Sequence, residues 1–366
     1  MSHAKIFSWN VNGVRSALGK GLGDFIASAD PDVLCLQETK CETAVASTLG
    51  LAFPHQFWHE AEKKGYSGTA VLSKTAPLSV ARHHSGWSEQ DPADWIAACE
   101  TVLTALGAKI DLKGIEAIGL SGQMHGATLL DASDNVLRPS ILWNDTRSAK
   151  EAAELDADPR FRAITGNIVF PGFTAPKLVW CARHEPELFG KVAKVLLPKD
   201  YLRLWLTGEH VAEMSDAAGT SWLDTGARDW SDDLLAATGL TRAQMPRLVE
   251  GSEVSGGLRG DLASRFGIRA GIPVAGGGGD NAASAVGVGV VKAGQAFVSL
   301  GTSGVLFAAS DTYQPDAASA VHSFCHALPD TWHQMGVILS AADALNWFAA
   351  NLGEDAAALS GSLGAL

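Results

Sequence analysis

GGGDNAASAVG, residues 277–287, is a run of glycines that ends in Asp280 and opens an alanine-rich segment. Glycines let a backbone approach a ligand closely, so this run can bring the Asp280 carboxylate against a substrate. The alternative is that Asp280 only caps the following helix, a common task for aspartate after glycines. The residues alone weigh these two interpretations equally. The run lacks the Lys-Ser/Thr ending of a P-loop, which excludes a Walker site.

A second polar turn follows an apolar strand in IEAIGLSGQMHG, residues 115–126. The pattern predicts a buried strand that ends near Met124 and His125, where the ligand sites of α/β sheets collect. A single histidine in such a turn is otherwise more often structural. GLSGQ at 119–123 is not a nucleophile elbow, because its last residue is Gln rather than Gly.

Strands and helices alternate along the rest of the chain, which predicts an α/β fold. SEQD at 88–91 offers a capping box for a helix with apolar residues at helical spacing from Trp95 to Leu106. Further predicted elements are two hairpins, at 296–309 and 322–339, and a helix at 340–352.

The first 80 residues have a different sequence pattern from the rest of the chain. KIFSW at 5–9 and DPDVLCLQ at 30–37 predict buried strands, and the segment 15–29 between them predicts a helix. YSGTAVLSK at 66–74 predicts a third strand. The sequence pattern changes near residues 77–82, which indicates a join between two different proteins.

Composition places the chain among globular proteins, with 46% apolar and 19% charged residues. The first 80 residues carry seven basic and seven acidic side chains, so the net charge of −12 lies entirely after them. This acidity argues against a nucleic-acid partner. Five scattered cysteines, with no signal peptide and no membrane-spanning stretch, predict a cytoplasmic protein without a membrane partner.

Two further motifs are weak when taken alone. Gly301, Thr302, Ser303 and Gly304 can form a tight turn whose N–H groups bind phosphate, although such a sequence is usually only a turn. His322, Cys325 and His326 offer zinc ligands without a fourth, so a place in the core is the preferred interpretation.

From about residue 80 onward the chain resembles the FGGY family of carbohydrate kinases, and within it the bacterial xylulokinases. The motifs that carry this resemblance are WSEQDP (87–92), SGQMHGATLLD (121–131), RPSILWNDTR (138–147), PGFTAPKLVW (171–180), LLPKDYLRL (196–204), MSDAAGT (214–220), GGGDNAASAVG (277–287), LGTSGV (300–305) and HSFCHALP (322–329). The resemblance implies ATP-dependent phosphorylation of D-xylulose to D-xylulose 5-phosphate, with ATP and magnesium as cofactors. A homodimer is left open.

The same resemblance implies roles for individual residues. Asp280 would be the general base on the sugar 5-hydroxyl, and Met124, His125 and Asn281 would contact the sugar. The turn from Gly301 to Gly304 would meet the ATP phosphates. With these motifs, the catalytic interpretation of Asp280 is preferred over the capping one.

Residues 1–79 resemble the start of the exonuclease III family of apurinic/apyrimidinic endonucleases. The matching runs are SWNVNGVR (8–15), PDVLCLQETKC (31–41) and GYSGTAVLSK (65–74). The resemblance implies that Glu38 is a magnesium ligand, with Asn10 and Asn12 arranged beside it. No later residue resembles the family's remaining catalytic elements, so we expect this piece to be inactive as a nuclease.

The expected fold is therefore α/β in three parts. Residues 1–79 form an endonuclease/exonuclease/phosphatase-type fragment, 80–288 an actin-like, ribonuclease H-like kinase domain, and 289–366 the start of a second such domain. The kinase family's first phosphate hairpin and the rest of its second domain find no match in the sequence. Kinase activity is consequently expected to be impaired or lost. A DNA-repair nuclease fragment and a non-functional fusion or misassembled frame are the alternatives.

Overall fold

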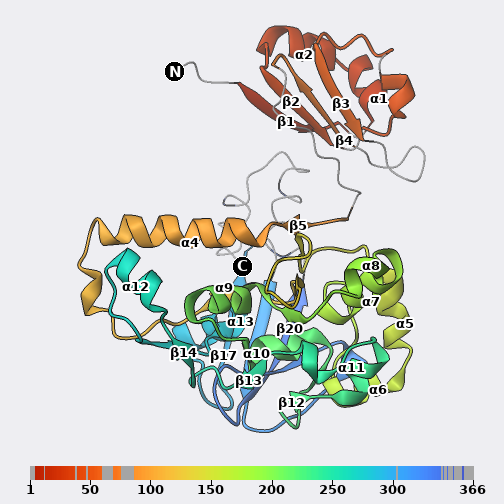
Figure 1. The fold of residues 1–366 in the computed structure, drawn as a ribbon. Helices are drawn as coiled ribbons and strands as arrows, with labels where there is room; N and C mark the ends of the chain where they lie inside the picture. The colour runs from red at the N-terminus through yellow and green to blue at the C-terminus, as the bar shows by residue number, and fades with distance from the viewer. Residues whose placement is uncertain are drawn as a thin grey trace. The chain divides into compact units, whose positions relative to one another are not determined.

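The structure is a computed structural model in which the chain divides into two compact units, Met1–Ser85 and Gly86–Leu366 (Figure 1). The residues that it describes are 5–11, 13–37, 39–46, 48–59, 69–75, 86–301, 304–338, 341, 344, 349 and 357. The predicted domain limits at 79/80 and 288/289 remain predictions.

The first unit is built on a four-stranded sheet with strand order β1-β2-β4-β3. Its strands are β1 (Ile6–Asn10), β2 (Val33–Gln37), β3 (His55–His59) and β4 (Thr69–Ser73). β1 and β2 are parallel, whereas β4 runs antiparallel to both of its neighbours. Leu34 and Leu36 of β2 alternate into the core, where Leu72 also lies. The three predicted strands are confirmed, and β3 was not predicted.

The predicted single helix over 15–29 is wrong, because two helices occupy this segment. They are α1 (Val14–Gly19) and α2 (Leu22–Ala29), followed later in the unit by α3 (Thr43–Ala46). Gly21 interrupts the helix with a φ of 100°, a conformation outside the right-handed helical region. The chain therefore turns between the two helices before it reaches β2.

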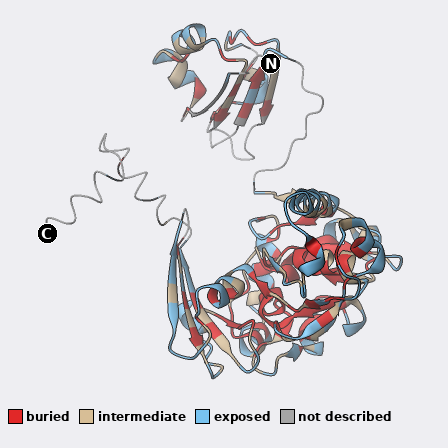
Figure 2. Cartoon of the chain, turned by 90° about the vertical axis from the view of Figure 1, so that its left-hand side faces the viewer, coloured by how far each residue is buried: buried red, intermediate tan, exposed pale blue. Residues whose placement is uncertain are grey.

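The second unit has two groups of helices around short central strands, and its buried residues gather in the interior (Figure 2). The large core contains Leu129, Phe161 and Trp222, all fully buried. The helices are α4 (Pro92–Gly107), α5 (Ala149–Asp156), α6 (Pro159–Thr165), α7 (Thr174–His184), α8 (Pro186–Phe189), α9 (Pro198–Thr207), α10 (Met214–Ala217), α11 (Asp232–Ala237), α12 (Gly260–Phe266) and α13 (Asp280–Gly287).

Most strands of this unit form two-stranded sheets. They are β5 (Glu89–Gln90), β6 (Ser121–Gly122), β7 (Thr128–Leu130), β8 (Ser140–Ile141), β9 (Lys194–Leu196), β10 (Val211–Glu213), β11 (Leu223–Asp224), β12 (Asp229–Trp230), β13 (Arg247–Val249), β14 (Val254–Gly257), β15 (Pro273–Ala275) and β16 (Gly278–Gly279). β6 pairs with β16 in parallel, and a parallel bridge between Ile118 and Val274 extends this pairing backwards. The predicted buried strand over 115–120 is wrong, because this segment makes only the single bridge at Ile118, and Ile115, Ile118 and Leu120 are no more than half-buried. The segment nevertheless lies beside the one that leads to Asp280.

A separate antiparallel sheet follows, with order β17-β18-β20-β19. Its strands are β17 (Ala296–Leu300), β18 (Gly304–Ser310), β19 (His322–Cys325) and β20 (Trp332–Ile338). Both predicted hairpins are confirmed, because β17 pairs with β18 and β19 with β20. The predicted helix over 340–352 lies largely outside the described residues.

The start of α4 differs from the prediction. Ser88 does not cap this helix, because Glu89 and Gln90 form β5 instead. Asp91 is the N-cap, and its carboxylate accepts a hydrogen bond from Ala93 N at 2.9 Å. The predicted apolar face is also only partly buried: Leu103 packs against a small core, whereas Val102 is 63% exposed.

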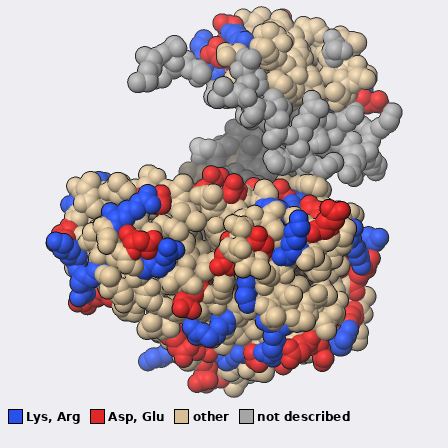
Figure 3. All heavy atoms as spheres, viewed as in Figure 1, with Lys and Arg blue, Asp and Glu red and all other residues tan. Residues whose placement is uncertain are grey.

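On the face of the second unit shown in Figure 3, acidic and basic side chains are interspersed. Among the described residues, none of the helices has the length and apolar character needed to cross a lipid bilayer.

Candidate active site

Two turns leave the carboxyl ends of the parallel strands β6 and β16. In this register Ser121 lies beside Gly278 and Gly122 beside Gly279. Met124–His125 and Asp280–Asn281 therefore emerge at the same edge, where ligand sites of parallel sheets form. Met124 packs directly on the second turn, because a Cβ built on Gly279 would lie 2.9 Å from its Cγ.

His125 is held in one orientation by its surroundings. Its Nδ1 lies 2.7 Å from Gly219 O, and its ring stacks on Phe173 with centroids 4.6 Å apart. The backbone of His125 has a φ of 68°, which side-chain-bearing residues rarely adopt. Gly219 permits the contact, because a Cβ there would lie 2.5 Å from the imidazole.

The imidazole of His125 is neutral near physiological pH. Loss of hydration lowers its pKa to about 3, and the positive charge of Lys177 acts in the same direction. Because a carbonyl only accepts, Nδ1 carries the proton and donates it to Gly219 O. Nε2 is then an acceptor, suited to a hydroxyl group of a sugar.

Lys177 supports the strained turn, and no role was predicted for it. Its Nζ donates to His125 O at 2.8 Å and to Gly172 O at 2.6 Å, and Thr174 Oγ1 donates to the same His125 carbonyl. Lys177 is fully buried, and the resulting loss of hydration lowers its pKa to about 7. The only sequence signal was a lysine within the otherwise apolar run PGFTAPKLVW.

Asp280 is the first residue of α13, whereas Gly279 occupies the N-cap position. Asp280 is therefore not the N-cap residue, although its carboxylate binds a first-turn N–H of α13. Its Oδ1 accepts hydrogen bonds from Asn281 N at 2.8 Å and from Asn281 Nδ2 at 3.2 Å. Among the described residues, no hydrogen bond reaches the second carboxylate oxygen.

The Asp280 side chain stays accessible at the surface, yet the surrounding protein reduces its hydration. This loss of hydration raises its pKa, and the hydrogen bonds from Asn281 oppose the shift. A carboxylate with a raised pKa is a better proton acceptor than an ordinary one. The geometry thus combines an accessible carboxylate of raised pKa with a fixed neutral imidazole at one edge.

Other predicted site residues lie elsewhere or outside the described part of the chain. Gly301 and Gly304 flank the turn between β17 and β18, where Leu300 pairs with Gly304. Thr302 and Ser303 lie outside the described residues, as do Glu38 and Asn12. Asn10 ends β1 and pairs with Gln37 of β2.

The residues considered as zinc ligands take part in core packing. Cys325 and His326 are fully buried, and His326 Nε2 lies 3.1 Å from Val290 O. His322 stacks on Phe324 with ring centroids 5.3 Å apart.

Residues 66–287 match the N-terminal domain of the FGGY family of carbohydrate kinases. The chain belongs to the FGGY family of carbohydrate kinases. Residues 7–109 match the endonuclease/exonuclease/phosphatase family, which overlaps the start of the FGGY match. Both resemblances drawn from the sequence are confirmed.

A xylulose kinase of Escherichia coli (strain K12) is 58% identical over 283 residues, which cover 77% of this chain and 58% of the relative. A xylulose kinase of Bacillus subtilis (strain 168) is 40% identical, covering 76% of this chain and 56% of the relative. This chain thus spans less than two thirds of the length of these curated relatives.

Two solved structures share the fold. A xyloylose kinase from Brucella ovis is 68% identical with a TM-score of 0.75, covering 78% of this chain and 60% of that one. Xylulose kinase from Rhodospirillum rubrum is 31% identical with a TM-score of 0.71, covering 78% and 58%. The expected actin-like α/β kinase fold is confirmed for the FGGY part.

Proposed function

We propose that the unit Gly86–Leu366 binds D-xylulose at the edge formed by Met124, His125, Asp280 and Asn281. The observation that carries this proposal is the parallel pairing of β6 with β16, which brings the two turns together. His125 Nε2 would accept a hydrogen bond from a sugar hydroxyl. The relatives named xylulose kinase support the choice of sugar.

The reaction that fits this site is phosphoryl transfer from ATP. Asp280 would take the proton of the 5-hydroxyl as that oxygen bonds to the γ-phosphorus, and the bond from phosphorus to the ADP oxygen would break. The products are D-xylulose 5-phosphate and ADP, with the proton on Asp280. The accessible second oxygen of Asp280 is free for this task.

The turn at Gly301–Gly304 is the candidate for the ATP phosphates. Leu300 and Gly301, which lead into this turn, are exposed at the end of β17, which supports the proposal. Magnesium, when bound with ATP, neutralises charge on the phosphates. Glu38 belongs to the other unit and is not assigned to this step.

Sugar binding and turnover are separate parts of the proposal. The sugar-side residues are all present in the described structure, whereas we expect ATP-dependent turnover to be impaired or lost. Calorimetry with D-xylulose tests the first part, and an ADP-release assay with D-xylulose and MgATP tests the second. A folded sample that binds no D-xylulose would contradict the proposed function.

Replacing the proposed base gives the first prediction. Asp280→Asn keeps the size of the side chain but cannot accept the proton, so any measurable turnover should fall by about 10²- to 10⁴-fold. D-xylulose affinity should fall by less than about tenfold, because a single hydrogen bond changes. Turnover by Asp280→Asn at the rate of the unaltered chain would show that Asp280 is not the base.

The nuclease alternative rests on the match over residues 7–109 and on the position of Glu38 after β2. One carboxylate does not stabilise both the attacking and the leaving oxygen of a phosphodiester. We therefore expect no magnesium-dependent incision of an abasic-site DNA duplex. Incision that is lost in Glu38→Gln would favour the nuclease over the kinase proposal.

The third alternative is a non-functional fusion or misassembled frame. Trypsin would release TAPLSVAR, residues 75–82, which spans the predicted join. Detection of this peptide in native cells would show that the fusion is produced. Its absence beside abundant peptides from both sides would favour the misassembled frame.

A further inference from the structure

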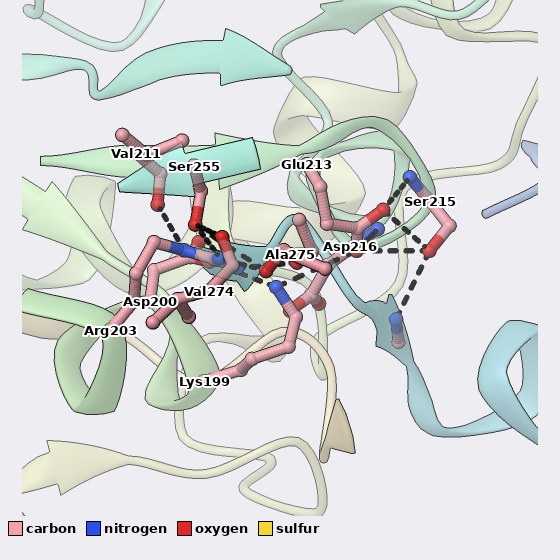
Figure 4. Close-up of polar contacts among 12 residues, drawn as sticks. Lys199, Asp200, Arg203, Val211, Glu213, Ser215, Asp216, Ser255, Val274 and Ala275 are labelled. Carbon is pink, nitrogen blue, oxygen red and sulfur yellow. Dashed lines mark hydrogen bonds and ion pairs between the residues drawn. The ribbon is translucent and has the colours of Figure 1, made fainter. Parts of the chain in front are cut away.

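A group of fully buried charged and polar residues contacts the glycine run that leads to Asp280 (Figure 4). The group, here called the buried network, consists of Lys199, Asp200, Arg203, Glu213, Ser215 and Asp216. Lys199 Nζ lies 2.8 Å from Asp200 Oδ1, 3.5 Å from Glu213 Oε1 and 3.4 Å from Asp216 Oδ2. None of these residues was assigned a role from the sequence.

Stability alone does not account for this arrangement. Removing charges from water costs several kcal/mol for each ion, and well-packed apolar residues often stabilise a protein as well or better. The network is nevertheless balanced: burial raises the pKa of Asp216 well above its usual range, which favours its protonated form. Lys199 and Arg203 both lie within ion-pair distance of Asp200, and Lys199 also lies near Glu213. Because these charges cost free energy to bury, their presence indicates that they hold a specific backbone conformation.

The polar contacts of the network converge on the two ends of the glycine run. Arg203 Nη1 donates to Ala275 O at 2.7 Å, and Arg203 Nη2 donates to Gly276 O at 2.5 Å. At the other end, Gly279 N donates to Ser215 Oγ at 3.0 Å. Ser215 Oγ in turn lies 2.9 Å from both carboxylate oxygens of Glu213, to which it donates.

The glycine run needs such external support. Gly277 has a φ of 78°, and a Cβ there would lie 2.1 Å from Leu120 O, so only glycine fits. Glycine is also the residue with the greatest conformational freedom, and consecutive glycines do not hold one shape by themselves. The position of the Asp280 backbone is therefore determined by groups that bind the run from outside.

Helix α9, which carries Lys199 and Arg203, also supports the turn that carries Met124 and His125. A Cβ on Gly122 would lie 3.0 Å from Lys199 Cβ, and a Cβ on Gly126 would lie 2.5 Å from Pro198 Cγ. The first turn of α9 thus backs the turn that carries Met124 and His125. Arg203, one turn later, holds the segment that carries Asp280.

We propose that the buried network positions Asp280 against the sugar-binding turn, and that Arg203 and Ser215 are positioning residues for the proton transfer. This inference rests on the proposed function for its sugar-binding consequence. Its structural consequence, a fixed glycine run, can be measured without any ligand.

Ser215→Ala is the sharpest test, because it removes one hydroxyl and leaves every charge in place. Thr165→Val is a matched control: Thr165 is also buried, and its Oγ1 accepts from Asn167 N at 3.1 Å and donates to Phe161 O at 2.8 Å. Both variants lose a buried hydroxyl that accepts from a backbone N–H. Only Ser215 contacts the glycine run.

Hydrogen exchange in the intact chain gives the ligand-free measurement. The amides of Gly276, Gly277 and Gly278 donate to carbonyls that neither variant removes. Ser215→Ala should increase exchange at these amides about tenfold or more, and Thr165→Val should leave it unchanged. Equal exchange in Ser215→Ala and the unaltered chain would overturn the inference.

Calorimetry with D-xylulose gives the second measurement. Ser215→Ala should weaken binding about three- to fivefold, no more than Asp280→Asn does, and Thr165→Val less than about twofold. In an Asp280→Asn background, Ser215→Ala should have less than about a twofold effect, because it acts through Asp280. Additive losses would overturn the positioning role. If the unaltered chain binds no D-xylulose, the proposed function fails, and hydrogen exchange still decides the inference.

Discussion

At the scale of single residues, two histidines of the second unit are neutral because of their surroundings. Loss of hydration lowers the pKa of His125 to about 3 and that of His322 to about 4. In the unfolded chain both would take up a proton near pH 6.5. Their contribution to stability is therefore complete above about pH 6.5 and is lost progressively as the pH falls towards the folded-state values.

This linkage predicts the pH dependence of His322→Gln. From pH 7 to pH 5 each of the two histidines should lower the free energy of unfolding by about 2 kcal/mol. His322→Gln should therefore lose about 2 kcal/mol less than the unaltered chain over this interval. Urea unfolding of both proteins at the two pH values measures the difference, with pH 7 as the internal reference. Equal losses would show that His322 is protonated in the folded state.

At the scale of one element, two buried carboxyl groups at the start of α10, those of Glu213 and Asp216, have different roles. The Glu213 carboxylate accepts hydrogen bonds from Ser215 N at 2.8 Å and from Asp216 N at 2.9 Å. It therefore caps α10 in addition to holding the Ser215 hydroxyl. Asp216 has a raised pKa because of its burial, and among the described residues its oxygens accept no hydrogen bond.

Neutral substitutions at these two positions should therefore differ. Burial raises the pKa of Asp216 and favours its uncharged form, so Asp216→Asn should change the free energy of unfolding by less than about 1 kcal/mol. Glu213→Gln leaves donors unpaired and upsets the charge balance, so it should cost about 2–4 kcal/mol. Chemical denaturation of both variants at pH 7 tests this order. A larger loss in Asp216→Asn would mean that Asp216 is ionised.

At the scale of the whole molecule, every residue assigned to the sugar site belongs to the unit Gly86–Leu366. The first unit has its own sheet and its own core around Leu34, Leu36 and Leu72. Removing residues 1–85 should therefore leave the D-xylulose affinity within about twofold of the full chain. Calorimetry on both proteins measures this. A larger loss, in a sample that unfolds at the same temperature, would place part of the site in the first unit.

The local motifs were predictable because each depends on neighbours in the chain. The apolar run that ends at Met124 and His125, and the glycines before Asp280, signal a strand edge and a close backbone approach. The hairpins over 296–309 and 322–339 follow from the same kind of local pattern. Gly21 marks the limit of such predictions, because it interrupts a helix through a backbone angle that the sequence does not specify.

The tertiary structure alone decided which distant groups meet. Lys177 reaches the carbonyl of His125 across 52 positions in the chain, and Arg203 reaches Gly276 across 73. Likewise, only the backbone conformation shows that Gly279, and not Asp280, is the N-cap of α13. Buried polar groups must find partners wherever packing places them, and no local pattern encodes those partners.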